Sequence, residues 1–141
     1  MKSAITLLRV SFWAGAILDG LNVIPLLFPE IGGYIFGLSD FNPGREYRYI
    51  SYTGASLMLG WTVLLIWADR KPLERKDIIF ITVVPVIIGI ALAGIFGFFS
   101  GAFTFSGLLP TLIMQCNLTI LFLYSYFFAI YQERRAVQQH K

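Results

Sequence analysis

The residues that could carry chemistry in this sequence are a few polar side chains within long apolar runs. Asp19 interrupts the first run, and Asn22 follows three residues later, on the same face of a helix. A carboxylate near the centre of a bilayer costs at least about 2.5–3.5 kcal/mol on insertion scales, so Asp19 is expected to face protein or water. Such a group can serve as a proton site, a cation site or a polar contact for a ligand. The alternative is a structural hydrogen bond between helices.

Ser56 and Gln115 lie at a similar depth in two other apolar runs. With about 1.5 Å of rise per residue and helix midpoints near residues 17, 59, 88 and 118, Asp19 lies roughly 3 Å and Asn22 roughly 7 Å to the outer side of the centre. Ser56 and Gln115 lie about 4 Å to the same side. We therefore expect Asp19, Asn22, Ser56 and Gln115 to line a ligand- or proton-binding polar cavity that opens away from the cytoplasm. The hypothesis fails if Asp19 faces lipid, or if a filled apolar layer separates it from Gln115.

Several chemistries are excluded by residue type. The chain has one cysteine, Cys116, and one histidine, His140. One cysteine cannot form an internal disulfide, a CxxC redox centre or a thiolate metal site, and one histidine cannot hold haem or a pair of metals within the bilayer. We therefore expect no cofactor and no metal. No nucleophile–base pair is visible, although Asp19, Tyr52 and Glu46 can exchange protons, so a membrane enzyme ranks third among the function classes.

Four apolar blocks position these side chains. The chain has 141 residues, 57% of them hydrophobic and 13% charged, whereas a soluble domain carries roughly twice that charged fraction. Each block is near the length that crosses a hydrocarbon core of about 30 Å. The sequence therefore predicts an all-α, polytopic membrane protein: a bundle of four transmembrane helices forming one membrane domain over residues 1–141. The helices are expected at about 4–28, 50–68, 78–99 and 105–131, with an outer interfacial loop at 30–49 and a cytoplasmic loop at 69–77.

The lysines and arginines predict the orientation. Nine lie near the termini and in the 69–77 loop, and two lie in the 30–49 loop. Since cytoplasmic segments carry the excess of basic residues, we expect both termini in the cytoplasm and the chain in the cell membrane. Basic residues placed between apolar blocks orient helices and attract anionic lipid headgroups, so nucleic acid is not an expected partner. The nine are Lys2, Arg9, Arg70, Lys71, Arg75, Lys76, Arg134, Arg135 and Lys141, and the two are Arg45 and Arg48.

Small residues spaced four apart favour close packing between helices. In the third block a close helix crossing is favoured over a wall for a flat ligand. On the last helix, Gln115 and Asn117 are both too polar to face lipid cheaply, so one is expected to bond within the chain and the other to join a neighbouring subunit. The longest stripe is Gly89, Ala93, Gly97 and Gly101, and shorter ones join Ser11 to Gly15 and Ala16 to Gly20.

The 30–49 loop carries charged residues beside several tyrosines. Arg45, Glu46 and Arg48 favour interfacial anchoring with local salt bridges over an anion-binding rim.

The segment from Arg48 to Lys71, RYISYTGASLMLGWTVLLIWADRK, is followed by Pro72 and preceded by the turn Asn42-Pro43-Gly44. These residues resemble a family of small prokaryotic membrane proteins with four helices, and the resemblance covers most of the chain loosely. It implies the four-helix fold and no known activity. Asp19 is also similar in kind to the single carboxylate in the first helix of the small multidrug exporters. The long outer loop, the length and the charge bias depart from that family, so this likeness is one of architecture alone.

Two hypotheses of function remain. The first is a non-enzymatic membrane protein that binds a small or lipidic ligand, or a partner subunit, through the outward-facing intramembrane cavity. The alternative is a small proton-coupled transporter in which Asp19 takes up and releases the proton. The expected partners are the lipid bilayer, a small-molecule or lipid ligand, and further copies of the chain in a homo-oligomer.

Overall fold

The computed structural model describes residues 2–35, 38 and 41–139, and every regular element within them is helical. Four stretches are long and apolar enough to cross a membrane. This confirms the all-helical class and the number of apolar helices expected from the sequence. The elements are α1 (Lys2–Leu27), α2 (Pro29–Ile35), α3 (Arg45–Asp69), α4 (Asp77–Ile81), η1 (Thr82–Ile87), α5 (Ile88–Phe99) and α6 (Phe105–Gln139).

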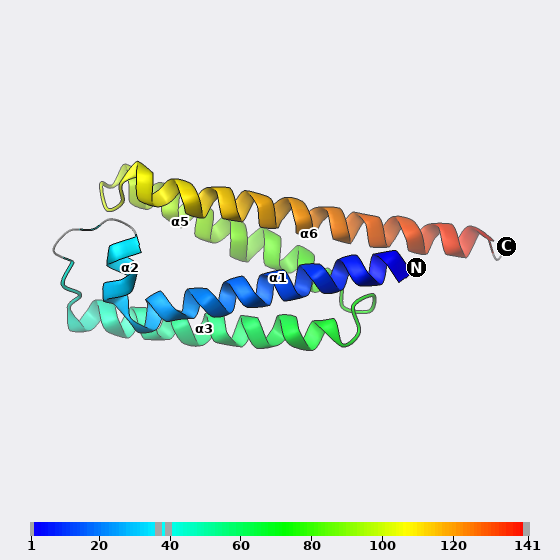
Figure 1. Ribbon diagram of the computed structural model, residues 1–141, viewed down its shortest axis with the longest axis horizontal. Coiled ribbons are helices and arrows are strands. Elements are labelled where there is room, and N and C mark those ends of the chain that lie inside the picture. Colours follow the sequence, from blue (N-terminus) through cyan, green and yellow to red (C-terminus); the bar gives the residue numbers. More distant parts are fainter. Residues whose placement is uncertain (1, 36–37, 39–40, 140–141) are drawn as a thin grey trace.

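The long helices run antiparallel to their neighbours along the chain (Figure 1). We call the end where α1 begins, α6 ends and the 70–76 connection lies the terminal end. The opposite end, with α2 and the turn between α5 and α6, is the loop end. The first hairpin is α1 with α3, and the second hairpin is α4–η1–α5 with α6. Residues 1, 36–37, 39–40 and 140–141 lie outside the described part, and with them part of the predicted outer loop, His140 and Lys141.

Helix boundaries differ from the predicted ones at the loop end. The expected loop 30–49 contains the short helix α2, which begins at Pro29, where a fixed φ and a missing N–H suit the first turn. Helix α3 begins at Arg45, directly after Gly44, whose backbone is extended. Residues 45–49 are charged or aromatic, so an apolar-block criterion misses this first turn although nothing in it opposes a helix.

The third span contains a wider turn around Pro85. Proline has no N–H to donate and its ring crowds the preceding turn, which disturbs the ordinary helical ladder. The chain accommodates it as the π-helical segment η1, after which the N–H of Ile88 donates to the carbonyl of Val83, five residues back. The span therefore continues across the proline with a widened turn.

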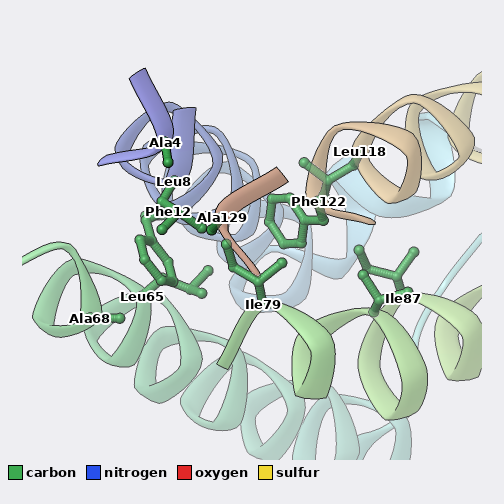
Figure 2. Packing of buried hydrophobic residues seen from close by; sticks show 12 residues of the cluster. Ala4, Leu8, Phe12, Leu65, Ala68, Ile79, Ile87, Leu118, Phe122 and Ala129 are labelled. Carbon is green, nitrogen blue, oxygen red and sulfur yellow. The ribbon is translucent and has the colours of Figure 1, made fainter. Parts of the chain in front are cut away.

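The main cluster of buried apolar residues (Figure 2) comes mostly from the half of the bundle nearest the terminal end. Helix α1 contributes residues from its first half, and α6 contributes residues from the part that returns to that end. Toward the loop end the two hairpins separate (Figure 1), and each keeps its own internal packing. The core residues are Ala4, Leu8, Phe12, Ala16, Leu65, Ala68, Ile79, Val83, Ile87, Leu118, Phe122 and Ala129.

Gly15 allows three helices to meet in this core. A Cβ atom at Gly15 would lie 2.8 Å from Cζ of Phe122 in α6 and 3.0 Å from Cδ1 of Leu65 in α3. The stripe in the third span behaves differently, because a Cβ at Gly89 meets nothing within 4 Å and Ala93 is exposed. Gly97 of the same stripe is buried, and a Cβ there would lie 2.5 Å from Cε2 of Phe103, so the close contact at this stripe is made at Gly97, with the turn that follows α5.

Candidate functional site

Asp19 lies on α1 one turn beyond Gly15, at the loop-end border of the buried core. Its side chain is partly buried. Its Oδ2 atom is fully covered and has no hydrogen-bond partner. An acceptor left in this state forfeits its hydration without gaining a donor, which costs about 1–3 kcal/mol.

Gln115 on α6 is in a similar state. The residue is 8% exposed, and its Oε1 atom is buried without a partner. Hydroxyls in the core behave otherwise, since Ser11, Thr82 and Ser125 each donate to a carbonyl of the preceding turn. Among the described residues, Asp19 Oδ2 and Gln115 Oε1 are the buried side-chain oxygen or nitrogen atoms without a partner.

The contact of Gly15 with Phe122 gives the register of the two helices that carry these atoms. Because α1 and α6 are antiparallel, a step of four residues along α1 matches a step of four back along α6. Asp19 is then level with Leu118, and Gln115 lies about 4.5 Å further toward the loop end, less than one helical turn. The structure therefore places Asp19 and Gln115 in one layer on two helices that pack together.

Asn22 and Ser56 have different positions. The same register places Asn22, which is half-buried, level with Gln115. Ser56 is exposed on the outer side of α3, because the face of α3 that turns toward α1 carries its neighbour Ala55. The structure does not bring Ser56 to Asp19, contrary to the expectation that all four side chains line one cavity.

A hydrogen bond between the two hairpins lies at the same depth. The contact of Gly15 with Leu65 places Trp61 of α3 level with Asp19. Its indole Nε1 donates to Oγ1 of Thr82 in η1 at 3.2 Å, so the indole is not available to Asp19. Sequence reasoning missed this pair. The sequence did hold one indication of this pair. Tryptophans of membrane proteins concentrate at the interfaces, so a tryptophan in the middle of a span is unusual and suggests a specific partner.

Two arginines of the first hairpin, Arg9 and Arg48, pair with other carboxylates. Arg9 Nε donates to Asp69 Oδ1 at 2.9 Å, and Trp13 Nε1 donates to Asp69 Oδ2 at 3.2 Å. Arg48 pairs with Glu30 at the loop end. Neither arginine neutralises Asp19.

The Glu30 carboxylate is stabilised in its charged form. Its own backbone N–H and then the guanidinium of Arg48 hydrogen-bond the carboxylate, and these bonds hold the pKa of Glu30 below its usual range. The salt bridge agrees with the expectation of local ion pairs in the outer loop.

An apolar groove adjoins Gln115. It has a volume of about 320 Å³ and lies between the η1–α5 segment and α6. Its walls are mainly aliphatic, and Asp19 does not line it. Of the two residues with an unpartnered oxygen, Gln115 therefore lines this groove and Asp19 does not. The lining residues are Ile87, Ile88, Ala91, Leu112, Gln115, Cys116, Thr119 and Ile120.

Comparisons with family models, with curated proteins and with solved structures gave no match. Within the described residues, no three His, Cys, Asp or Glu side chains lie together as a metal site. The arrangement at Asp19 and Gln115 offers hydrogen-bond acceptors and, when Asp19 is ionised, one negative charge. It suits binding of a donor group or exchange of a proton.

Proposed function

We propose that this chain is a multi-pass protein of the cell membrane that binds an amphipathic small molecule or lipid at Asp19 and Gln115. Both termini lie in the cytoplasm, so the site lies toward the outer half of the membrane. The orientation is supported by the basic residues, nine of which are at the termini or in the 69–77 loop. The observation that carries the proposal is the pair of buried, unpartnered oxygens in one layer.

The energetic argument rests on that pair. Each unsatisfied buried acceptor costs about 1–3 kcal/mol, so a bound group that donates to both recovers a large part of this cost. An occupant has room beside Gln115, because Gln115 lines the groove between η1–α5 and α6, and the two hairpins separate toward the loop end (Figure 1). A ligand that binds the folded state alone raises its stability, by about 2.7 kcal/mol at one hundred times its dissociation constant.

Thermal unfolding of the purified protein tests the proposal. The probes are ten-carbon amphiphiles that differ in headgroup: decylamine, decyltrimethylammonium, decanol and decyl sulfate. At least one is expected to raise the unfolding temperature of the native chain in a saturable way. The rise should be strongly reduced by Asp19→Asn and by Gln115→Leu. The proposal fails if no probe acts saturably, or if all variants respond alike.

Asn117→Leu is the matched control. Asn117 lies two residues from Gln115 on the same helix, is exposed, and its Nδ2 donates to the carbonyl of Ile113 at 2.8 Å. Its removal changes the polarity of α6 without touching the unpartnered oxygens. This variant is expected to respond to the probes as the native chain does.

A proton-coupled transporter is the second candidate. The observation that favours it is that, within the part of the chain that the structure describes, Arg9 and Arg48 are bound to other carboxylates and no salt bridge reaches Asp19. A carboxyl without a fixed counter-ion can exchange its proton during a transport cycle. Proteoliposomes with an internal pH dye test this role. The native chain should carry protons in response to a pH gradient, and Asp19→Asn should not. If neither form carries protons, the transporter function is excluded.

A further inference from the structure

The two unpartnered oxygens restrict what can occupy the site, and this inference rests on the ligand-binding function proposed above. Asp19 Oδ2 and Gln115 Oε1 are both acceptors. At the same depth Trp61 Nε1 donates to Thr82 and Thr82 Oγ1 donates to the carbonyl of Ile78 at 2.7 Å, and half-buried Asn22 donates to neither of the two oxygens. An occupant must therefore bring its own hydrogen-bond donors.

The charge of the site favours a cation. Among the described residues, Arg9 is held by Asp69 and Arg48 by Glu30, and no salt bridge reaches Asp19, so a cationic occupant would supply its counter-ion. Two opposite charges attract strongly in a medium of low dielectric constant, and two like charges repel by the same amount. An anionic headgroup is therefore disfavoured beside Asp19.

The surroundings suit a hydrocarbon chain. Gln115 also lines the apolar groove between η1–α5 and α6, where its neighbours include Ile87, Ala91 and Leu112. The terminal half of the bundle is filled by core side chains, whereas the hairpins separate toward the loop end (Figure 1). A chain lying against these aliphatic walls brings its polar head to Gln115, and the head reaches the covered Asp19 Oδ2 once side chains of this layer move aside.

We propose that the occupant is a protonated primary amine carried on a hydrocarbon chain. An ammonium group has three N–H donors and no acceptor, which is enough to bond both oxygens and to neutralise the carboxylate. Other headgroups meet these requirements less well. A quaternary ammonium has the positive charge without a donor, and an alcohol has a donor without the positive charge. A sulfate is negatively charged and has no donor.

The four decyl probes at pH 7, where the alkylamine is protonated, separate these requirements. Apparent affinities follow from the dependence of the unfolding temperature on probe concentration. Decylamine is expected to bind tightest, with decyltrimethylammonium and decanol about 10-fold or more weaker and decyl sulfate inactive. Asp19→Asn should weaken decylamine about 10- to 100-fold, and Asn117→Leu should leave its affinity unchanged.

Gln115→Glu gives a second arm. It replaces one acceptor by another and adds a negative charge, so it should retain or strengthen decylamine binding while weakening binding of decanol. The amine proposal is overturned if decanol, decyl sulfate or decyltrimethylammonium binds as tightly as decylamine in an Asp19-dependent way. It is also overturned if folded Gln115→Glu loses decylamine. Those results leave ligand binding at the site standing, whereas identical responses of the native chain and Asp19→Asn to every probe end the proposed function itself.

Discussion

Arg9 and Asp69 form a two-point contact between α1 and α3: Nε of Arg9 donates to Oδ1 at 2.9 Å, and Nη2 donates to Oδ2 at 3.2 Å. The contact lies near the terminal end and joins the two helices of the first hairpin. It also uses the one basic residue within the apolar part of α1. Asp19, ten residues further along the same helix, is left without that partner.

The two partners of this ion pair should respond unequally to mutation. The Asp69 side chain is 10% exposed and that of Arg9 is 58% exposed. Arg9→Met leaves a covered carboxylate with only Trp13 as a donor, whereas Asp69→Asn leaves a cation that can reach water. We expect Arg9→Met to lower the unfolding temperature more than Asp69→Asn. Equal losses, or the reverse order, would show that the buried carboxylate does not depend on Arg9.

Gly15 should tolerate no side chain. A Cβ atom there lies 2.8 Å from the ring of Phe122, which is fully buried, so Gly15→Ala is expected to cost about 1–3 kcal/mol of unfolding free energy. Gly60→Ala is the control, since Gly60 is exposed on α3 with nothing within 4 Å of its Cβ position. It should be neutral or slightly stabilising, because alanine favours a helix. Denaturant unfolding of both variants checks this, and a neutral Gly15→Ala would contradict the close three-helix contact.

Trp61 and Thr82 should act as a pair. Trp61→Phe removes the hydrogen bond between the hairpins and is expected to cost about 0.5–1.5 kcal/mol. Thr82→Val removes the same bond together with the bond to Ile78. A double-mutant cycle on the unfolding free energy should therefore give a double variant less destabilised than the sum of the singles. Strict additivity would mean that the indole and the hydroxyl do not interact.

Glu30 should make stability depend on acid pH. Its pKa lies below the ordinary value of 4.5 in the folded chain, so the folded state holds the carboxylate charged more readily than the unfolded state does. The stabilisation is then fully present above about pH 4.5, and it is lost as the pH falls through the lower folded value. Glu30→Gln should remove this part of the pH dependence when unfolding temperatures are compared between about pH 6 and 3. Unchanged profiles in the variant would show that neither the backbone N–H bond nor the Arg48 contact holds the Glu30 carboxylate in its charged form.

The number and order of the long helices could be predicted because each apolar block is near the length that spans a bilayer. The axial alignment of Asp19 and Gln115 could be predicted too, since rise per residue is constant, and the register of α1 against α6 brings them within one helical turn of each other along the bundle. The direction in which each side chain points around its helix could not be predicted. Which face of α3 meets α1 depends on how side chains pack, and Ser56 lies on the face left outside.

Side-chain contacts between residues far apart in the chain also could not be predicted from the sequence. Arg9 and Asp69 are 60 residues apart, and Trp61 and Thr82 are 21 apart. No periodicity relates such residues, because their contact is a product of the bundle. The wider turn at Pro85 was foreseeable in part, since proline disturbs a helix, but a proline alone does not specify the π-helical form that the turn takes.

Photolabelling with a decylamine that carries a diazirine on its chain tests most directly whether Asp19 and Gln115 form one ligand site. Adducts located by mass spectrometry are expected to cluster on α1 around Asp19 and on α6 around Gln115. Unlabelled decylamine should compete them away, and Asp19→Asn should abolish them. Adducts spread over the outer faces of all four long helices, insensitive to competition and to Asp19→Asn, would contradict the site.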